Sequence, residues 1–108
     1  MDVEVLAENL GLETHEYMEL LSLFLKTASS DMSKLQSAIE EKDAQKAAVA
    51  AHSIKGAAGN LGLMKIHEGA KAIEEDAREK CLEASVVQEL KENLELLAES
   101  IQTQFDAD

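Results

Sequence analysis

The chain has 108 residues, enough for about one domain with a single hydrophobic core. Its formal net charge of −12 argues against nucleic acid and anionic lipid as partners, because both carry phosphate anions. No apolar run approaches the ~20 residues of a membrane span, and no signal-like segment opens the chain, so a cytoplasmic protein is expected. The single cysteine, Cys81, excludes an internal disulfide, and no spacing typical of a metal site is present.

Apolar residues recur three and four positions apart almost throughout the chain, which predicts helices and no strands. A short first helix is expected from about Asp2 to Leu10, ended by Gly11. Val3, Leu6 and Leu10 would lie on one side of it.

Thr14 is the predicted N-cap of a long second helix. The inward stripe of that helix is Tyr17, Leu21, Phe24, Ala28, Met32, Leu35 and Ile39. A polar turn from Glu40 to Asp43 then reverses the chain, and Asp43 caps a third helix. The core positions of the third helix are Ala47, Ala51, Ile54, Ala58 and Leu61.

A break near Asn60 to Gly62 separates the third helix from a fourth. The inward positions of the fourth are Leu63, Ile66, Ala70, Ile73 and Ala77. Ser85 to Gln88 has the pattern of a capping box that opens the last helix. The stripe of the last helix is Val87, Leu90, Leu94, Leu97, Ile101 and Phe105.

Four amphipathic helices joined by short loops predict an all-α fold, in which they form an antiparallel up-down four-helix bundle. The short additional N-terminal helix would cover one end of the bundle. No linker, internal repeat or low-complexity segment is present, so a single domain is expected over residues 1–108.

The register of the third helix places His52 at about 140° from the middle of its apolar stripe, which points the side chain largely to solvent. Lys55 and Gly56 follow one turn later, with Gly56 at about 180° from the core. Glycine costs a helix interior about 1 kcal/mol relative to alanine, so Gly56 beside an exposed histidine indicates the close approach of another backbone. For Gly59, the approach of another backbone is one explanation, and close packing within the bundle or the approaching helix end explains the residue equally well.

The run from His52 to Gly62, HSIKGAAGNLG, closely resembles the signature of histidine phosphotransfer (HPt) domains of two-component phosphorelays. The resemblance continues through the small, apolar and acidic positions Ile66, Ala70, Ile73 and Glu74. It implies that His52 accepts a phosphoryl group from a receiver-domain aspartate and passes it to another receiver.

The resemblance also implies roles for three neighbours of this histidine. Lys55 would supply a compact cation for the incoming phosphate, as an exposed lysine whose removal leaves the bundle folded. Gly56 would leave room for the receiver. Glu74 would accept a hydrogen bond from Nδ1 of His52 and leave Nε2 as the nucleophile. Lys71, one turn before Glu74, is a further candidate cation.

The implied partners are response-regulator receiver domains and an upstream hybrid sensor kinase, with Mg²⁺ expected in the receiver and no cofactor in this chain. No glycine-rich nucleotide-binding loop is present, so we expect a monomeric phosphoryl carrier and not an enzyme. Two alternatives stay open. The chain could be the histidine-bearing substrate domain of a chemotaxis-type kinase, or a non-catalytic helical adaptor.

Charge is distributed unevenly along the chain. The segment from Ala44 to Lys71 carries a net charge of +3 and contains one acid, Glu68. Its lysines are Lys46, Lys55, Lys65 and Lys71. This electropositive island around His52 would attract an anionic phosphoaspartate site. The other two histidines, His15 and His67, are expected to be surface residues.

Overall fold

The computed structural model describes residues 3–79 and 84–106, and within this part the chain forms five α-helices and no strands. The helices are α1 (Val3–Asn9), α2 (Thr14–Glu41), α3 (Ala44–Asn60), α4 (Met64–Arg78) and α5 (Ala84–Asp106). The predicted helices are therefore all present, and their order along the chain is as expected. No helix in the described part combines the length and the hydropathy that a membrane span needs.

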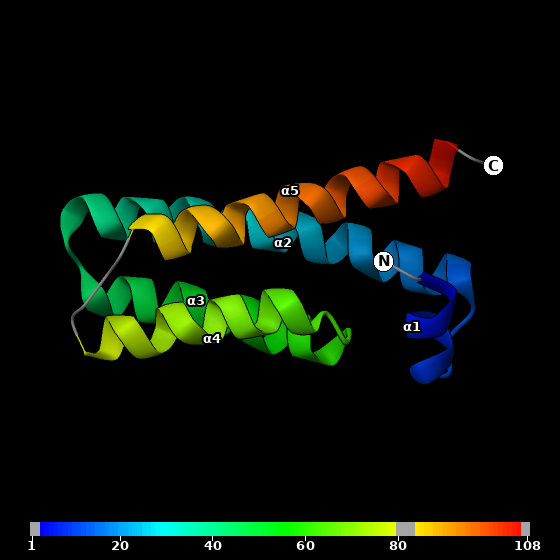
Figure 1. Ribbon diagram of the computed structural model, residues 1–108, viewed down its shortest axis with the longest axis horizontal. Coiled ribbons are helices and arrows are strands. Elements are labelled where there is room, and N and C mark those ends of the chain that lie inside the picture. Colours follow the sequence, from blue (N-terminus) through cyan, green and yellow to red (C-terminus); the bar gives the residue numbers. More distant parts are fainter. Residues whose placement is uncertain (1–2, 80–83, 107–108) are drawn as a thin grey trace.

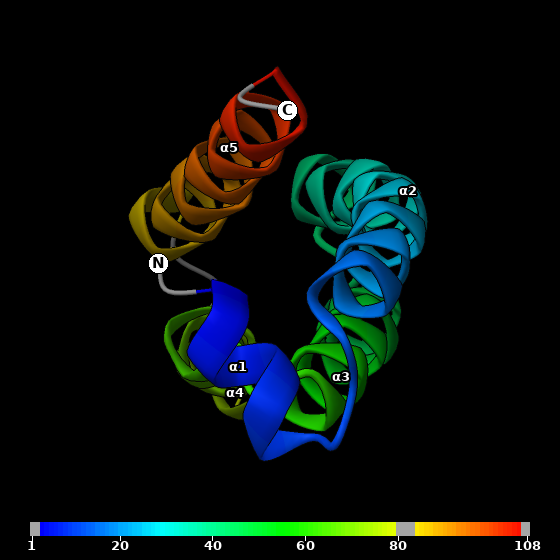
Figure 2. The same ribbon diagram turned by 90° about the vertical axis from the view of Figure 1, so that its right-hand side faces the viewer.

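The four long helices form a ring in which each helix packs against two neighbours (Figure 1, Figure 2). α3 packs against α2 and α4, and α5 closes the ring by packing against α4 and α2. The short helix α1 packs against α2 and lies at the end of the bundle where α3 and α4 are joined. The predicted all-α bundle with a covering N-terminal helix is thus confirmed.

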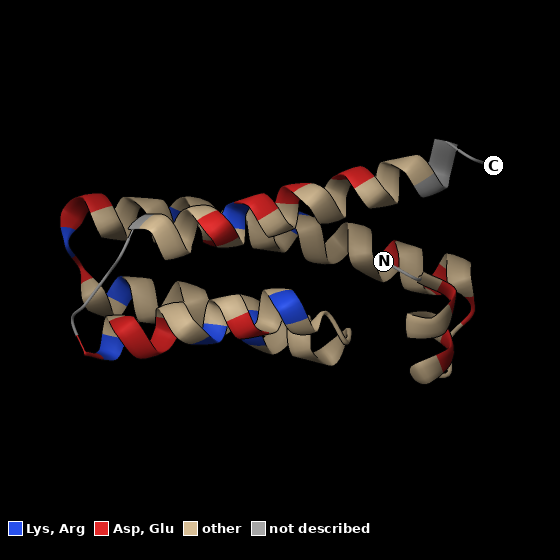
Figure 3. Ribbon diagram, viewed as in Figure 1, with Lys and Arg blue, Asp and Glu red and all other residues tan. Residues whose placement is uncertain are grey.

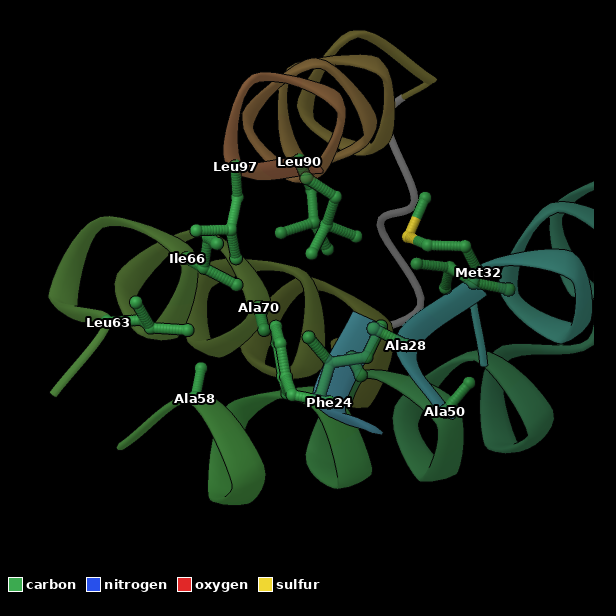
Figure 4. Packing of buried hydrophobic residues seen from close by; sticks show 14 of the residues in the cluster. Phe24, Ala28, Met32, Ala50, Ala58, Leu63, Ile66, Ala70, Leu90 and Leu97 are labelled. Atoms are coloured by element: carbon green, nitrogen blue, oxygen red, sulfur yellow. The ribbon is translucent and has the colours of Figure 1, made fainter. Parts of the chain in front are cut away.

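The core lies inside this ring and is built mainly from aliphatic side chains. Figure 4 shows side chains from α2, α3, α4 and α5 meeting in one interior, among them Phe24, Ala58, Ile66 and Leu90. α3 contributes mostly alanines, so its backbone lies close to the neighbouring helices. Those buried alanines are Ala47, Ala50, Ala51 and Ala58.

Most of the predicted inward positions are buried, with differences at the edges of the core. Ile39 and Leu61 are only half-buried. In α1, Leu6 is half-buried and Leu10 is 43% exposed, whereas Ala7 is buried. Leu10 follows the last residue of α1, so the helical spacing that predicted its direction no longer applies there. Phe105 and Cys81 lie outside the residues whose side chains are described.

Three helix ends test the predicted caps. Asp43 is the N-cap of α3 as predicted, and its Oδ1 accepts a hydrogen bond from the backbone N–H of Lys46 at 3.0 Å. The predicted cap of α2 is wrong: Glu13 is the N-cap and Thr14 is the first helical residue. The backbone N–H of Glu13 donates to Oε1 of Glu16 at 3.0 Å. The side chain of Glu16 thus satisfies the backbone N–H of the N-cap residue itself.

The predicted capping box of the last helix is also wrong in its position. α5 begins at Ala84, so Ser85 already lies inside the helix and is not its N-cap. Serine is tolerated in a first helical turn as well as at the cap, so the residue type alone did not fix the boundary. The residues before Ala84, from 80 to 83, lie outside the described part of the chain.

The α3–α4 turn is tied to α2 by a tyrosine. The hydroxyl of Tyr17, a fully buried residue of α2, donates a hydrogen bond to the backbone carbonyl of Leu61. The turn itself has the left-handed backbone that glycine favours at Gly62, where φ is 74°. This contact fixes the end of α3, the helix that carries His52.

Candidate functional site

His52 lies on the surface of α3, as its register predicts, with a side chain that is 65% exposed. Its Nδ1 is 2.6 Å from Oε2 of Glu74 on α4. An ionised carboxylate only accepts hydrogen bonds, so Nδ1 carries the proton of the neutral ring. The lone pair of Nε2 therefore remains available on the exposed imidazole.

Glu74 is the buried centre of the cluster, with a side chain that is 5% exposed. Its Oε1 accepts a hydrogen bond from Nζ of Lys55 at 2.6 Å. Its Oε2 accepts one from His52 and a longer one, at 3.3 Å, from Arg78. The hydrogen bond from Lys55 lowers the pKa of Glu74 below its ordinary value of 4.5, whereas burial raises it. The bond from His52 and the charges of Lys55 and Arg78 lower this pKa further, so Glu74 is ionised at neutral pH.

Lys55 does not occupy the position that the sequence suggested for it. Its side chain is only 24% exposed, and its ammonium group is engaged by the buried carboxylate of Glu74. The expectation that the lysine is exposed is therefore wrong. Its long side chain reaches an acid on the neighbouring helix, which a pattern within α3 does not reveal.

Arg78 is the site residue that the sequence reasoning missed. It lies one turn after Glu74 on α4, and its side chain is 69% exposed. The spacing of Glu74 and Arg78, four residues apart, is a recognised pattern for a helical ion pair and could have identified it. Lys71, the predicted further cation, is exposed and forms no ion pair with Glu74.

The two glycines of α3 near His52 have different surroundings. A Cβ added at Gly56 would meet nothing within 4 Å, so this position is open, as its register predicts. A Cβ added at Gly59 would lie 3.0 Å from Nδ1 of His67 on α4. This contact supports close packing within the bundle as an explanation for Gly59, which also lies next to the last residue of α3.

The remaining two histidines differ in exposure. His15 is a surface residue as predicted, with Nδ1 3.3 Å from an oxygen of Glu13. The prediction for His67 is wrong: the residue is half-buried, and its Nδ1 donates to the backbone carbonyl of Lys55 at 2.9 Å. Its position in α4 turns the ring towards α3, which a wheel of α4 alone does not reveal.

α3 is also held on its other side, by α2. Oγ of Ser53, the residue after His52, donates to Oδ2 of Asp31 at 2.7 Å. Asp31 is 8% exposed and lies on α2. Contacts from two neighbouring helices therefore fix the orientation of the α3 segment that carries His52.

The electropositive island is real in sequence but partly neutralised in the structure (Figure 3). Nζ of Lys46 is 2.8 Å from an oxygen of Glu41, and Lys55 is paired with Glu74. Lys65 and Lys71 are exposed, and neither forms an ion pair with a described residue. No group of side chains in the described part could hold a metal ion.

Comparison with known proteins identifies the family of this chain. The family model described as Hpt domain matches residues 19–102, which is most of the chain. No curated protein matches the sequence. The crystal structure of histidine-containing phosphotransfer protein B (HptB) from Pseudomonas aeruginosa PAO1 is similar, with a TM-score of 0.85 and 24% identity, over 100% of this chain and 96% of that one. The chain therefore belongs to the Hpt domain family, and it is an intermediate of a histidine phosphotransfer relay.

Proposed function

We propose that His52 is the residue that carries the phosphoryl group, received from the aspartate of one receiver domain and passed to that of another. The observation that carries the proposal is the 2.6 Å contact between Nδ1 of His52 and the buried carboxylate of Glu74. This contact assigns the ring proton to Nδ1 and leaves the lone pair of Nε2 free to attack.

In the transfer step, Nε2 attacks the phosphorus atom of the aspartyl phosphate. The N–P bond forms while the bond from phosphorus to the aspartate oxygen breaks, and the aspartate leaves as a carboxylate. The ring then bears a proton on Nδ1 and the phosphoryl group on Nε2, so it is positively charged. The carboxylate of Glu74 stabilises this charge, and the same steps in reverse pass the group to the second receiver.

The neighbours of His52 support this role through charge and access. Lys55 keeps Glu74 ionised through Oε1, and the exposed guanidinium of Arg78 adds a cation beside Oε2, the oxygen that His52 contacts. Gly56 leaves the adjacent surface free for the receiver backbone. Phosphoryl transfer depends on positioning and electrostatics, and in this proposal the receiver supplies the aspartate and the Mg²⁺. The chain itself acts as a monomeric phosphoryl carrier that consists of one helical bundle domain and has no cofactor of its own.

The test follows labelled phosphate from a phosphorylated receiver domain onto the chain. We expect the parent protein to acquire label that is lost in acid and retained in base, as a phosphoramidate behaves. His52→Gln should acquire none. His15→Gln is the matched control and should acquire label at the parent rate, because His15 is exposed and lies on α2. Label on the His52→Gln chain would contradict the assignment of the site, and label acquired only from an ATP-loaded kinase domain would contradict a receiver as the donor.

A further inference from the structure

Two separate contacts from α4 meet at one residue of α3, Lys55, in addition to the contact between Glu74 and His52. The side chain of Lys55 binds Glu74, and its backbone carbonyl accepts a hydrogen bond from Nδ1 of His67 at 2.9 Å. Since a carbonyl oxygen only accepts, Nδ1 of His67 carries a proton. His67 and Glu74 are seven residues apart, close to two helical turns, so both lie on the face of α4 that meets α3.

Gly59 makes room for the ring of His67. A Cβ at residue 59 would lie 3.0 Å from Nδ1 and 3.4 Å from Cε1 of His67. The first distance is tighter than an ordinary van der Waals contact, so a side chain at this position would require the ring of His67, which contacts the Lys55 carbonyl, to shift. Gly56, three residues earlier on the same helix, has no such neighbour and shows that the requirement is specific to residue 59.

We propose that His67 is a positioning residue for His52, and that Gly59 is the notch in α3 that admits it. The hydrogen bond to the Lys55 carbonyl fixes α3 against α4 one turn beyond His52, and on α4 it lies about two turns before Glu74, which meets Nδ1 of the phospho-acceptor ring. A backbone carbonyl is a more rigid point of attachment than the four-carbon side chain of Lys55. The inference rests on the proposed role of His52, and it adds two residues that do not touch the phosphoryl group.

Protonation of His67 does not remove this attachment. The Nδ1–H group is a donor in the neutral tautomer that the contact selects, and it remains a donor in the imidazolium form. The hold on α3 is therefore independent of the charge of His67.

Two substitutions of His67 separate the hydrogen bond from the mere presence of a side chain. His67→Ala removes the donor, whereas His67→Asn places an amide N–H close to the position of Nδ1. The readout is the ¹⁵N NMR spectrum of the His52 ring, which reports whether the proton resides on Nδ1, together with the rate of transfer from a phosphorylated receiver.

We expect His67→Ala to reduce the population of the Nδ1–H tautomer of His52 and to slow transfer on the order of tenfold, since small misplacements of a nucleophile are costly. His67→Asn should restore most of both. His15→Ala, which removes an exposed histidine from α2, should leave both at the parent value.

Gly59→Ala supplies an independent test through the same ring. Alone, it should displace His67 and reproduce the loss of the His52 tautomer and of the transfer rate. In the His67→Ala background, it should cause no further loss and should raise the melting temperature, because the clash is gone and alanine favours a helix.

The following results would overturn the proposal. One is a His52 ring spectrum and transfer rate in His67→Ala that equal those of the parent. The other is a loss on Gly59→Ala that is the same whether or not His67 is present. Failure of the proposed function is distinguishable, because it is read from the His52→Gln chain, whereas the ring spectrum requires no phosphate. If His67→Ala fails to fold, His67→Asn and Gly59→Ala decide the matter.

Discussion

At the scale of single residues, the site depends on one buried carboxylate that is shared among three donors. Glu74 could not remain ionised in its buried position without partners, and Lys55, His52 and Arg78 together satisfy both of its oxygens. Lys55 therefore affects His52 indirectly, through the charge state and position of Glu74. This gives Lys55 a structural role in addition to any contact with an incoming phosphate.

Lys55→Ala should lower the free energy of unfolding by about 1–3 kcal/mol, because it leaves the buried oxygen Oε1 of Glu74 without its charged donor. Urea unfolding measures the change. Lys65→Ala is the matched control: Lys65 is exposed, and its removal should change stability by no more than about 0.5 kcal/mol. Equal midpoints for the two variants would contradict a structural role for Lys55.

Glu74 also predicts a pH dependence. Its folded-state pKa lies below the ordinary value of 4.5, so its ionised form contributes stability above about pH 4.5, and this contribution is lost as the pH falls through the lowered folded-state pKa. Glu74→Gln should lack this component. Unfolding free energies of parent and variant, measured from pH 7 down to pH 3, should therefore converge at the acid end; parallel curves would contradict the prediction.

Helical register correctly placed His52 and Gly56 on the exposed side of α3. The family resemblance correctly placed Glu74 beside Nδ1 of His52. The sequence did not reveal that Lys55 bends to Glu74, nor that His67 contacts the Lys55 carbonyl. Both features depend on the rotation and the height of α4 relative to α3, which no pattern within one helix contains.

At the scale of whole elements, the apolar stripes predicted α2 to α5 well, whereas the helix ends were less certain. Thr14 is the better intrinsic cap by residue type, yet the chain places Glu13 there and satisfies it through Glu16. The predicted and observed N-caps of α2 therefore differ by one residue. The connection from α2 to the α3–α4 turn through Tyr17 was not predictable, because its partner is a backbone carbonyl 44 residues away.

Tyr17→Phe should destabilise the protein by about 1 kcal/mol, the usual net value of one hydrogen bond, and should leave the core packing intact. Burial raises the pKa of Tyr17 above 10.0, so its hydrogen bond is present up to that pH and is lost as the pH rises through the folded-state pKa. Thermal unfolding at pH 7 and at pH 11 measures both effects. The difference between parent and variant should shrink at the higher pH, and a constant difference would contradict the assignment.

At the scale of the whole molecule, basic and acidic residues are distributed unevenly over the helices. α3 and α4 carry the lysines of the island, and α4 also carries acidic residues, whereas the charged residues of α5 are mainly acidic (Figure 3). Lys46, Lys55 and Arg78 are each paired with an acid, whereas Lys65 and Lys71 form no ion pair with a described residue. The distribution of charge along the sequence predicted the island. The ion pairs that neutralise part of its positive charge could be identified only from the structure.

At Gly56, substitutions are expected to change the stability of the fold and the rate of phosphoryl transfer in opposite directions. This position is an exposed helix interior with nothing within 4 Å of an added Cβ. Gly56→Ala should therefore stabilise the fold by up to about 1 kcal/mol, and Gly56→Gln should also fold. Transfer from a phosphorylated receiver should nevertheless fall, mildly for alanine and steeply for glutamine, since a side chain one turn from His52 holds the receiver aspartate away from Nε2.

Melting temperature and transfer rate, measured on the same samples, test this opposition. Ala98→Gln is the control: it adds the same side chain at an exposed position of α5, a helix that does not pack against α3, and should change neither quantity appreciably. If Gly56→Gln unfolds the bundle, the glycine is needed for packing. If the variant folds and transfers phosphate as fast as the parent, the receiver does not approach His52 across this face of α3.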